Sequence, residues 1–536
     1  MKSDTGFPED ASSLRCVKGA WAAALCLLMA CSPPVPPPEV SANGETLQGE
    51  WVDGKVSVAV FRGVPFAAPP TGDMRWRAPR DHQARTGVQK ATEFAPACMQ
   101  GQHIVDWYAE VAEAFGHGPE VVGHPSGVSE DCLYLNIWTP ELSAEANLPV
   151  MVYVHGGSNK GGWSYEPNYL GDRLAGHGAV VVSIAYRLGP LGFFSHPALE
   201  NNAGEPVANF GLLDIEQAFR WINQNIRNFG GDPNKLTGFG ESAGAANLLT
   251  LALVTDDESG LFRRVIAQST GGSMSKLQSL AKEQANGQTM LSYFDLEPDV
   301  SIEALQSLSA AELLDAAEER LPGHYYAPVI DGDLIQATPL QSLREGSGSK
   351  LEVLIGTNAD EWLMYLEPDS GTEQLEKWIM ETAPEFAGSL LALAAEESSP
   401  RKALDKLETA SNMLCPSRLI AATVTGQGGQ AYLYYFTRQR PGEGGNTLGV
   451  YHGAELPYVF DQHDSWLPVD EVDQQVTQTV MDYWLAFARN GSPDSPGHPG
   501  WPVYTSSQRF VMELGENSKI FQAGDTELCR YLGPVR

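Results

Sequence analysis

The pentapeptide Gly-Glu-Ser-Ala-Gly at residues 240–244 constrains the fold more than any other part of this chain. It follows a short apolar run at 235–239 that is typical of a strand, and it precedes small and apolar residues at 243–253 that are typical of a helix. The two glycines let the strand and the helix approach each other across a turn too tight for side chains, which displays Ser242 at the helix N-terminus. A strand that leads directly into a helix in this way favours an α/β fold.

Strands and helices alternate on both sides of this turn. Strand-like runs lie at residues 149–155, 179–186, 263–268 and 351–356. The first two are almost continuously apolar, which predicts a sheet covered on both faces. Apolar residues recur every three or four positions over 212–229, which predicts an amphipathic helix, and the breakers at 230–233 end it. We therefore expect an α/β protein with a central, mostly parallel sheet flanked by helices.

Two long segments, about 272–345 and 362–425, read as helical and loop-rich, without a repeat or a linker. We expect them to be insertions that cover one end of the sheet, where the ligand sites of open α/β sheets lie. Residues 42–536 are then predicted to form a single catalytic domain with large cap segments.

The first 41 residues have the composition of an export segment. Arg15 and Lys18 precede an apolar run at 19–30, which is as long as a signal-peptide core and too short to span a bilayer. The run ends in Leu-Met-Ala-Cys, which resembles the lipidation box of bacterial lipoproteins. We predict a lipoprotein-type signal peptide over 1–30, lipidation of Cys31 and a proline-rich tether over 31–41. The expected location is the outer membrane, on its periplasmic or cell-surface face; cleavage without lipidation would leave a periplasmic or secreted protein.

Acidic residues outnumber basic ones by 67 to 35, so the formal net charge is −32. Such a surface repels the phosphates of nucleic acids and anionic lipid headgroups. The expected partner is a small-molecule substrate, with no nucleic acid, and with membrane contact only through the N-terminal lipid.

A serine hydroxyl at neutral pH needs a base, and the base needs an acid that orients it. In α/β hydrolases the order along the chain is nucleophile, acid, histidine. Four histidines follow Ser242 in the sequence: His324, His452, His463 and His498. His452 is the best candidate base, because the others lie in polar or Pro/Gly-rich loops or precede any strong candidate acid. Asp360 and Glu361 both follow a strand-like run, and either could be the acid.

Acyl transfer also requires backbone N–H groups that stabilise the oxyanion of the tetrahedral intermediate. One such group belongs to Ala243, which follows the nucleophile. The others are expected in the glycine-rich turn at 155–158, after an earlier strand. His155 in that turn is interpreted as a structural residue. This chemistry needs no metal and no organic cofactor.

These features together resemble the type-B carboxylesterase and cholinesterase family of α/β hydrolases, over nearly the whole chain from residue 56. The matching segments are residues 61–67, 129–136, 229–233, 240–244, 360–361 and 452–456. The resemblance implies a serine carboxylic-ester hydrolase that forms an acyl-enzyme, and it selects Glu361 over Asp360 as the acid. The implied triad is Ser242, Glu361 and His452, and the implied oxyanion-hole residues are Gly157, Ser158 and Ala243.

Four of the seven cysteines lie outside the export segment: Cys98, Cys132, Cys415 and Cys529. An even number in an exported chain predicts two disulfides, with three pairings open, and a buried reduced set is the alternative. The family resemblance implies that Cys98 pairs with Cys132 and Cys415 with Cys529.

Three positions depart from the family's pattern. Ser158 stands where the oxyanion turn usually has a third glycine, and Trp362 stands where a glycine usually follows the acid. No tryptophan lies shortly before Cys132, where cholinesterases place their choline-binding indole; Trp107 lies nearer the other end of that loop. This argues against a cholinesterase. The remaining alternatives are a lipase or an amidase with the same triad, and a non-catalytic adhesion module, although here all three triad positions are filled.

Overall fold

The computed structural model describes residues 35–201, 204–254, 261–275, 277–296, 300–523 and 527–533. The predicted signal peptide, the lipidation site Cys31 and the first residues of the tether lie outside these ranges. Pro38–Arg536 form one compact unit. Among the helices in the described ranges, none has the length and apolar composition needed to cross a bilayer.

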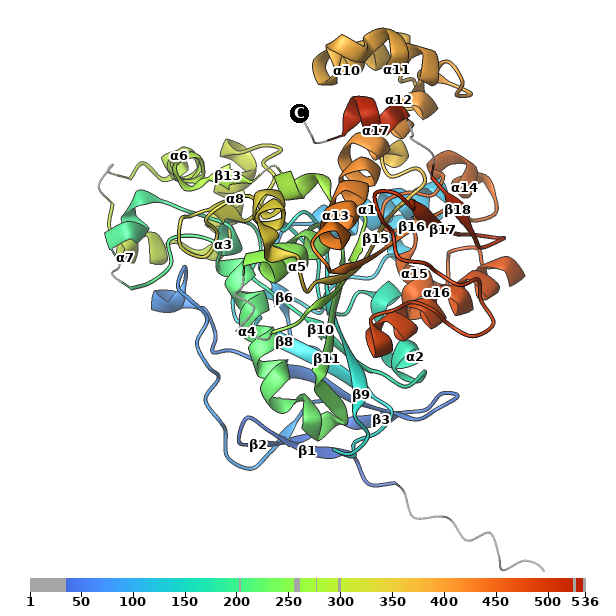
Figure 1. Ribbon diagram of the computed structural model, residues 1–536. Coiled ribbons are helices and arrows are strands. Elements are labelled where there is room, and N and C mark those ends of the chain that lie inside the picture. Colours follow the sequence, from blue (N-terminus) through green and yellow to red (C-terminus); the bar gives the residue numbers. More distant parts are fainter. Residues whose placement is uncertain are drawn as a thin grey trace, which may run out of the picture. The chain divides into compact units, whose positions relative to one another are not determined.

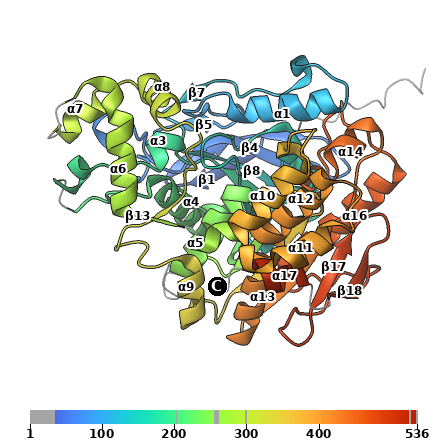
Figure 2. The same cartoon turned by 90° about the horizontal axis from the view of Figure 1, so that it is seen from above.

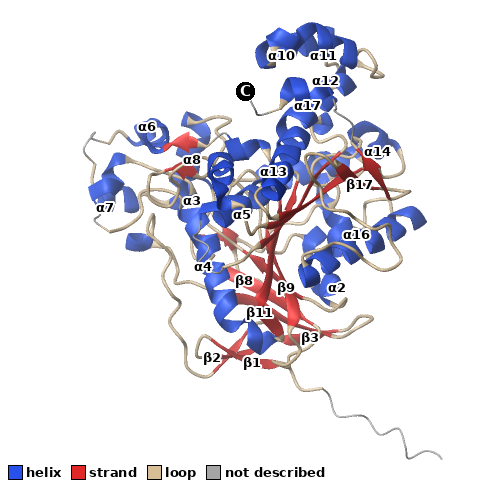
Figure 3. Cartoon of the chain, viewed as in Figure 1, coloured by secondary structure: helices blue, strands red, loops and turns tan. Residues whose placement is uncertain are grey.

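An eleven-stranded sheet forms the centre of this unit (Figures 1 and 3). In spatial order its strands are β18 (Lys519–Gln522), β17 (Phe510–Leu514), β16 (Gln430–Phe436), β15 (Glu352–Asn358), β12 (Arg264–Gln268), β11 (Gly231–Glu241), β9 (Leu148–Val154), β10 (Val180–Ile184), β8 (Tyr134–Thr139), β4 (Val58–Pro65) and β3 (Glu50–Val52). The run from β17 to β10 is parallel, and the strands at both edges are antiparallel. The expected α/β architecture with a mostly parallel sheet is confirmed.

The almost continuous apolar strands are explained by burial on both faces of this sheet. In β9, Val150 and Val152 face a core that includes side chains of α4 (Phe210–Asn225) and α5 (Ser242–Val254). Met151 and Tyr153 face the opposite core, to which α16 (Glu471–Asn490) contributes. Because successive side chains point to opposite faces, a strand covered on both sides must be apolar at every position.

The breaker cluster at 230–233 both ends a helix and begins a strand. A 3₁₀ turn at Ile226–Phe229 follows α4, and Gly230 adopts a φ of 82°. A Cβ at Gly230 would lie 2.0 Å from the carbonyl oxygen of Glu141, so no other residue fits there. β11 begins at the next residue, and its pairing with β9 is irregular between Gly231 and Leu236, which accommodates Pro233.

Both insertions are mostly helical (Figures 1 and 2). The first contains α6 (Leu280–Leu291), α7 (Ile302–Gln306), α8 (Ala310–Arg320) and α9 (Pro339–Ser342). The second, which we call the cap, contains α10 (Thr372–Thr382), α11 (Ala387–Ala394), α12 (Pro400–Thr409) and α13 (Cys415–Gly426). In both views α10, α11 and α12 lie beside α17 (Glu527–Leu532), with which they share a hydrophobic cluster that includes Leu390, Leu407 and Leu532.

The remaining elements are short, apart from α1 in the loop between Cys98 and Cys132, and two of them, α3 and α15, are completely buried. They are α1 (His103–Ala114), α2 (Asp172–Ala175), α3 (Gly189–Gly192), α14 (Glu443–Leu448), α15 (Leu456–Phe460), and the strands β1 (Glu39–Ala42), β2 (Glu45–Gln48), β5 (Val88–Lys90), β6 (Ala97–Cys98), β7 (Val128–Ser129), β13 (Gln278–Ser279) and β14 (Val329–Ile330).

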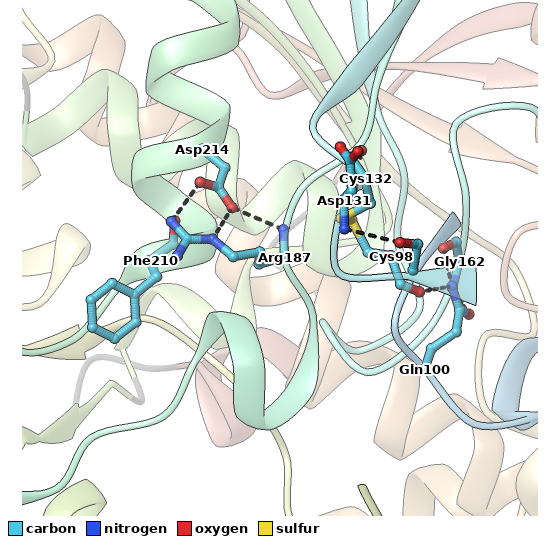
Figure 4. Close-up of a disulfide and its surroundings, with 9 residues drawn as sticks. Cys98, Gln100, Asp131, Cys132, Gly162, Arg187, Phe210 and Asp214 are labelled. Atoms are coloured by element: carbon cyan, nitrogen blue, oxygen red, sulfur yellow. Dashed lines mark hydrogen bonds and ion pairs between the residues drawn. A yellow bond between two sulfur atoms is a disulfide. The ribbon is translucent and has the colours of Figure 1, made fainter. Parts of the chain in front are cut away.

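The structure contains two disulfides, in the pairing that the family resemblance implies. Cys98 and Cys132 close the loop that carries α1 (Figure 4). Cys415, the first residue of α13, is bonded to Cys529 in α17, 114 residues later. The second bond therefore fastens the C-terminal helix to the cap.

Candidate active site

The turn at 240–244 connects β11 to α5, and it holds Ser242 in a strained conformation. Ser242 has a φ of 52°, in the left-handed region that a non-glycine residue enters only at a cost. A Cβ at Gly244 would lie 2.1 Å from the carbonyl oxygen of Val154, and one at Gly240 would lie 2.6 Å from the same atom. The neighbouring β9 therefore excludes side chains at both glycines, as the sequence pattern predicts.

The glycine-rich turn after β9 presents unpaired N–H groups next to this serine. Gly157 and Ser158 have φ values of 93° and 57°. Over the described ranges, no acceptor is bonded to the backbone N–H of Gly157, Ser158 or Ala243. Free donors at the N-terminus of α5 and in this turn are what an oxyanion requires. Ser158 thus adopts the left-handed conformation itself, although a glycine usually stands at this position of the family.

Gln100 joins the neighbouring disulfide loop to the segment that follows this turn. Its amide oxygen accepts a hydrogen bond from Gly162 N at 2.8 Å, and its amide nitrogen donates to Gly162 O at 2.7 Å. Gln100 lies two residues after Cys98, which is bonded to Cys132 (Figure 4). The disulfide loop is therefore bonded to the chain four residues after Ser158, a candidate oxyanion-hole residue.

Glu361 and His452 form a short hydrogen bond. Glu361 Oε2 lies 2.6 Å from His452 Nδ1, and Glu361 Oε1 accepts from Asn358 N and from Thr357 Oγ1, both at 2.7 Å. Burial opposes ionisation of Glu361, but these bonds and the charge of His452 outweigh it and lower the pKa of the carboxyl. The neighbouring Asp360 bonds to other groups. Between the two acids left open by the strand pattern, the structure brings Glu361 to the imidazole.

The other histidines considered from the sequence have different partners. His155 is buried and stacked on Tyr186, and burial lowers its pKa to about 4. The remaining three contact residues outside this site: His324 lies beside Glu283, His463 beside Arg440 and Thr477, and His498 beside Asp482. The structure thus keeps these side chains away from Ser242.

Sequence reasoning missed Glu241, which precedes the nucleophile. Its Oε1 lies 3.0 Å from His452 Nε2, and within the described residues no hydrogen bond joins Ser242 Oγ to that imidazole. A second buried carboxylate, Glu455, accepts from Asn358 Nδ2 at 2.6 Å and from Gln268 Nε2 at 2.8 Å. The available signals were an acid beside the turn serine and an acid three residues after the histidine.

These carboxylates control the charge of the imidazole. Burial alone would lower the pKa of His452, but Glu241 and Glu361 on its two sides outweigh burial and raise it. Burial raises the pKa of Glu241 to about 8. The Glu241–His452 pair therefore holds its proton at neutral pH.

Two cavities meet at Ser242, and both are lined by Ser158, His452 and Tyr365. We call the smaller one, about 180 Å³, the acidic cavity, because it is also lined by Glu166, Glu241, Trp107 and Tyr108. We call the larger one, about 400 Å³, the apolar cavity, because its walls include Leu277, Tyr325, Ala327, Trp362 and Met413. Trp107 Nε1 donates to the hydroxyl of Tyr365 at 3.1 Å. Tyr365 is thus one of the side chains shared by two cavities whose linings differ in chemistry.

Comparison with known proteins points to the same chemistry. The sequence profile of the carboxylesterase family matches residues 36–532. The fumonisin B1 esterase of Sphingopyxis macrogoltabida is 33% identical over 480 residues, which cover 85% of this chain and 83% of that protein. The para-nitrobenzyl esterase of Bacillus subtilis is 31% identical over 495 residues, covering 89% and 95%. A solved carboxylesterase of Geobacillus stearothermophilus superposes with a TM-score of 0.79 at 30% identity, over 92% of this chain and 99% of that one.

Proposed function

This chain belongs to the carboxylesterase family, and from that premise we propose that it hydrolyses carboxylic esters through covalent catalysis at Ser242, with His452 as the base and Glu361 as the orienting acid. The observation that carries the proposal is the 2.6 Å bond between Glu361 and His452 beside a strained serine turn. It supports the assignment because the acid binds Nδ1, which leaves Nε2 to exchange protons with the nucleophile.

The reaction proceeds in two acyl transfers. Ser242 Oγ attacks the carbonyl carbon while His452 Nε2 takes the hydroxyl proton, and the resulting oxyanion accepts hydrogen bonds from Gly157, Ser158 and Ala243. Collapse of the tetrahedral intermediate breaks the ester bond, and Nε2 returns the proton to the leaving alkoxide. Water then attacks the acyl-enzyme in the same manner and releases the acid. Nε2 must turn from Glu241 toward Ser242, and catalytic hydrogen bonds commonly tighten only when substrate binds.

Labelling with a fluorophosphonate tests this assignment directly. The probe phosphonylates an activated serine, and we expect a single adduct that peptide mapping locates on Ser242. Parallel assays with p-nitrophenyl esters, p-nitroanilides and emulsified triglycerides distinguish an esterase from an amidase or a lipase. A chain that takes up no probe and cleaves none of these compounds would support the adhesion-module alternative.

The pH dependence of hydrolysis should depend on Glu241. The base works only when neutral, and the neighbouring carboxylates stabilise the imidazolium, so we expect the acid limb of the kcat/KM profile to lie above pH 7. Glu241→Gln removes one negative charge at 3.0 Å from Nε2. This lowers the pKa of His452, and the midpoint of the limb should move down by about one pH unit. Glu376→Gln, an exposed change on α10, should leave the midpoint in place; a midpoint that rises in Glu241→Gln would contradict this reading.

The position of Nε2 indicates where the two halves of the ester lie. Nε2 delivers the proton to the leaving alcohol, and it faces Glu241 in the acidic cavity, whereas Glu361 and Trp362 line the apolar cavity. We therefore assign the alcohol to the acidic cavity and the acyl chain to the apolar one.

Trp362→Gly tests that assignment. Removing the indole enlarges the apolar cavity, and each accommodated methylene contributes roughly 1 kcal/mol to transition-state binding. We expect kcat/KM for a p-nitrophenyl octanoate, relative to the acetate, to increase by about tenfold. Tyr293→Gly, which removes an aromatic side chain outside both cavities, is the control. An unchanged acyl-length profile would place the acyl chain elsewhere.

A further inference from the structure

Three polar side chains share one face of the cap helix α12. Arg401, Lys402 and Asp405 occupy positions i, i+1 and i+4, which lie on the same side of a helix. The opposite side, with Ala403, Leu404 and Leu407, packs into the cap cluster. The face with the three polar side chains is turned toward residues 359–366, which we call the acid loop because it contains Glu361 and Tyr365.

Lys402 reaches the acid loop through Asp360. Its Nζ lies 2.9 Å from Asp360 Oδ1. The other oxygen, Asp360 Oδ2, accepts a hydrogen bond from Val450 N at 2.8 Å, and the backbone N–H of Asp360 donates to Val450 O at 3.1 Å. Val450 precedes His452 by two residues. Asp360 thus joins α12, the acid loop and the segment that carries the base.

Asp405 binds Trp362, the residue that follows Glu361. Asp405 is 1% exposed, and its Oδ1 accepts from Trp362 N at 2.9 Å and from Thr409 Oγ1 at 3.4 Å. The charge of the neighbouring Asp360 also acts on this carboxyl group. Both neighbours of Glu361 are therefore bound to side chains of α12: Asp360 to Lys402, and Trp362 to Asp405.

Asp405 holds a proton at neutral pH. Burial and the charge of Asp360 raise the pKa of Asp405 to about 8, against the opposing charge of Lys402. The hydroxyl of Tyr435, on β16, lies 3.5 Å from the carbonyl oxygen of Ala359, the residue before Asp360. Asp405 therefore accepts from Trp362 N as a neutral acid and does not place a second negative charge beside Asp360.

Arg401 binds a different part of the acid loop. It donates to the carbonyl oxygens of Leu363 at 2.6 Å and of Leu366 at 3.2 Å. These two residues flank Tyr365, which lines both cavities and accepts the hydrogen bond from Trp107. Arg401 therefore binds the backbone on both sides of Tyr365, which we call the shared wall because it lines both cavities, and does not bind the acid itself.

We propose that Asp405, Lys402 and Arg401 are positioning residues for the reaction: the first two hold Glu361 and His452 at their working distance, and Arg401 holds the shared wall that selects the substrate. The proposal rests on the proposed function of Ser242, Glu361 and His452. Small displacements of catalytic groups are costly, since an error of about 1 Å can reduce a rate by about 10²-fold.

Two substitutions of Asp405 separate positioning from mere structural support. Asp405→Ala removes the bonds to Trp362 N and Thr409 Oγ1, and we expect kcat to fall by about 10- to 100-fold with a smaller change in KM. Asp405→Asn replaces the protonated acid by a neutral amide whose oxygen still accepts from Trp362 N, so it should restore most of kcat at pH 7. Above about pH 8 two adjacent carboxylates repel each other in the unmodified protein, so the ratio of Asp405→Asn activity to wild-type activity should rise with pH.

Arg401→Ala should change substrate binding more than the rate of the chemical step. Its main effects are expected on KM and on the acyl-length profile of p-nitrophenyl esters. Lys406→Ala is the matched control, because this lysine lies on the same helix but pairs with Glu397 at its exposed surface. Active sites are counted in every sample by phosphonate titration, so that a loss of folded protein does not count as a loss of kcat.

The outcomes are distinct. Equal losses of kcat in Asp405→Ala and Asp405→Asn, or an Asp405→Ala protein with wild-type kcat, overturn the proposal. If Asp405→Ala does not fold, the pH-dependent ratio for Asp405→Asn decides, and a flat ratio overturns it. A wild-type protein that takes no phosphonate on Ser242 refutes the proposed function instead.

Discussion

Ser242→Ala is expected to lower kcat/KM for p-nitrophenyl acetate by about 10⁴-fold or more. The change removes the hydroxyl oxygen that we propose forms the acyl-enzyme, while the candidate oxyanion donors and both cavities stay in place. The residual rate should resemble that of water attack assisted by those donors alone. The measurement is a steady-state assay with protein free of other esterases, since a trace contaminant would exceed the residual rate.

Controls make this result interpretable. Alanine can occupy the turn without new contacts, so the variant should unfold at nearly the wild-type temperature and should take up no fluorophosphonate. Ser292→Ala, an exposed serine far along the chain from the turn, should hydrolyse at the wild-type rate. Substantial hydrolysis by a folded Ser242→Ala protein would show that another group is the nucleophile.

Glu361→Gln is expected to cost about 10⁴-fold in kcat, nearly as much as loss of the nucleophile. Glu361 Oε1 accepts from Asn358 N and Thr357 Oγ1, so the amide oxygen of a glutamine must take that place. The amide NH₂ then faces His452 Nδ1 and donates to it. The imidazole is thereby forced to carry its proton on Nε2, where it cannot accept the proton of Ser242. Glutamine has nearly the same size and shape as glutamate, so the expected loss of kcat comes from the lost charge and from the changed position of the imidazole proton.

Asp360→Asn is the comparison that separates the two neighbouring acids. Asparagine keeps an oxygen for Val450 N or Lys402, so we expect a loss at least tenfold smaller than that of Glu361→Gln. NMR of the His452 imidazole provides a second measurement. It reports which ring nitrogen carries the proton, and Glu361→Gln should move that proton from Nδ1 to Nε2. A Glu361→Gln enzyme that retains high activity, together with an inactive Asp360→Asn enzyme, would reverse the assignment.

The sheet was predictable because it is buried on both faces. Apolar runs such as 149–155 leave little choice between strand and loop, and β9 begins and ends within one residue of that run. The breakers at 230–233 were predictable, but the end of α4 was not: it lies at Asn225, and a 3₁₀ turn covers Ile226–Phe229. The need for glycine at 230 comes from Glu141, remote in sequence, whose carbonyl oxygen leaves no room for a Cβ. Tertiary contact thus determines where an element ends, while local pattern determines that it exists.

The candidate site was partly predictable for the same reason. Ser242, Glu361 and His452 follow turn and strand-end signals that local sequence carries, and the family resemblance chose between the two acids. Glu241 lies in the same turn as Ser242, but its position there does not show that it contacts His452, and the α12 contacts carry no local signal. Their role depends on which helix of the cap lies over the acid loop, and nothing in the sequence of α12 specifies that neighbour.

During synthesis the ribosome delivers α12 and α13 long before α17. Because Cys415 pairs with a residue 114 positions later, this bond cannot form until residue 529 has emerged. A nascent chain that ends earlier already contains Ser242, Glu361 and His452, the proposed triad, but it lacks α17, which completes the hydrophobic cluster of the cap. The order of translation therefore places the covalent closure of the cap, next to the acid loop, among the last events of folding.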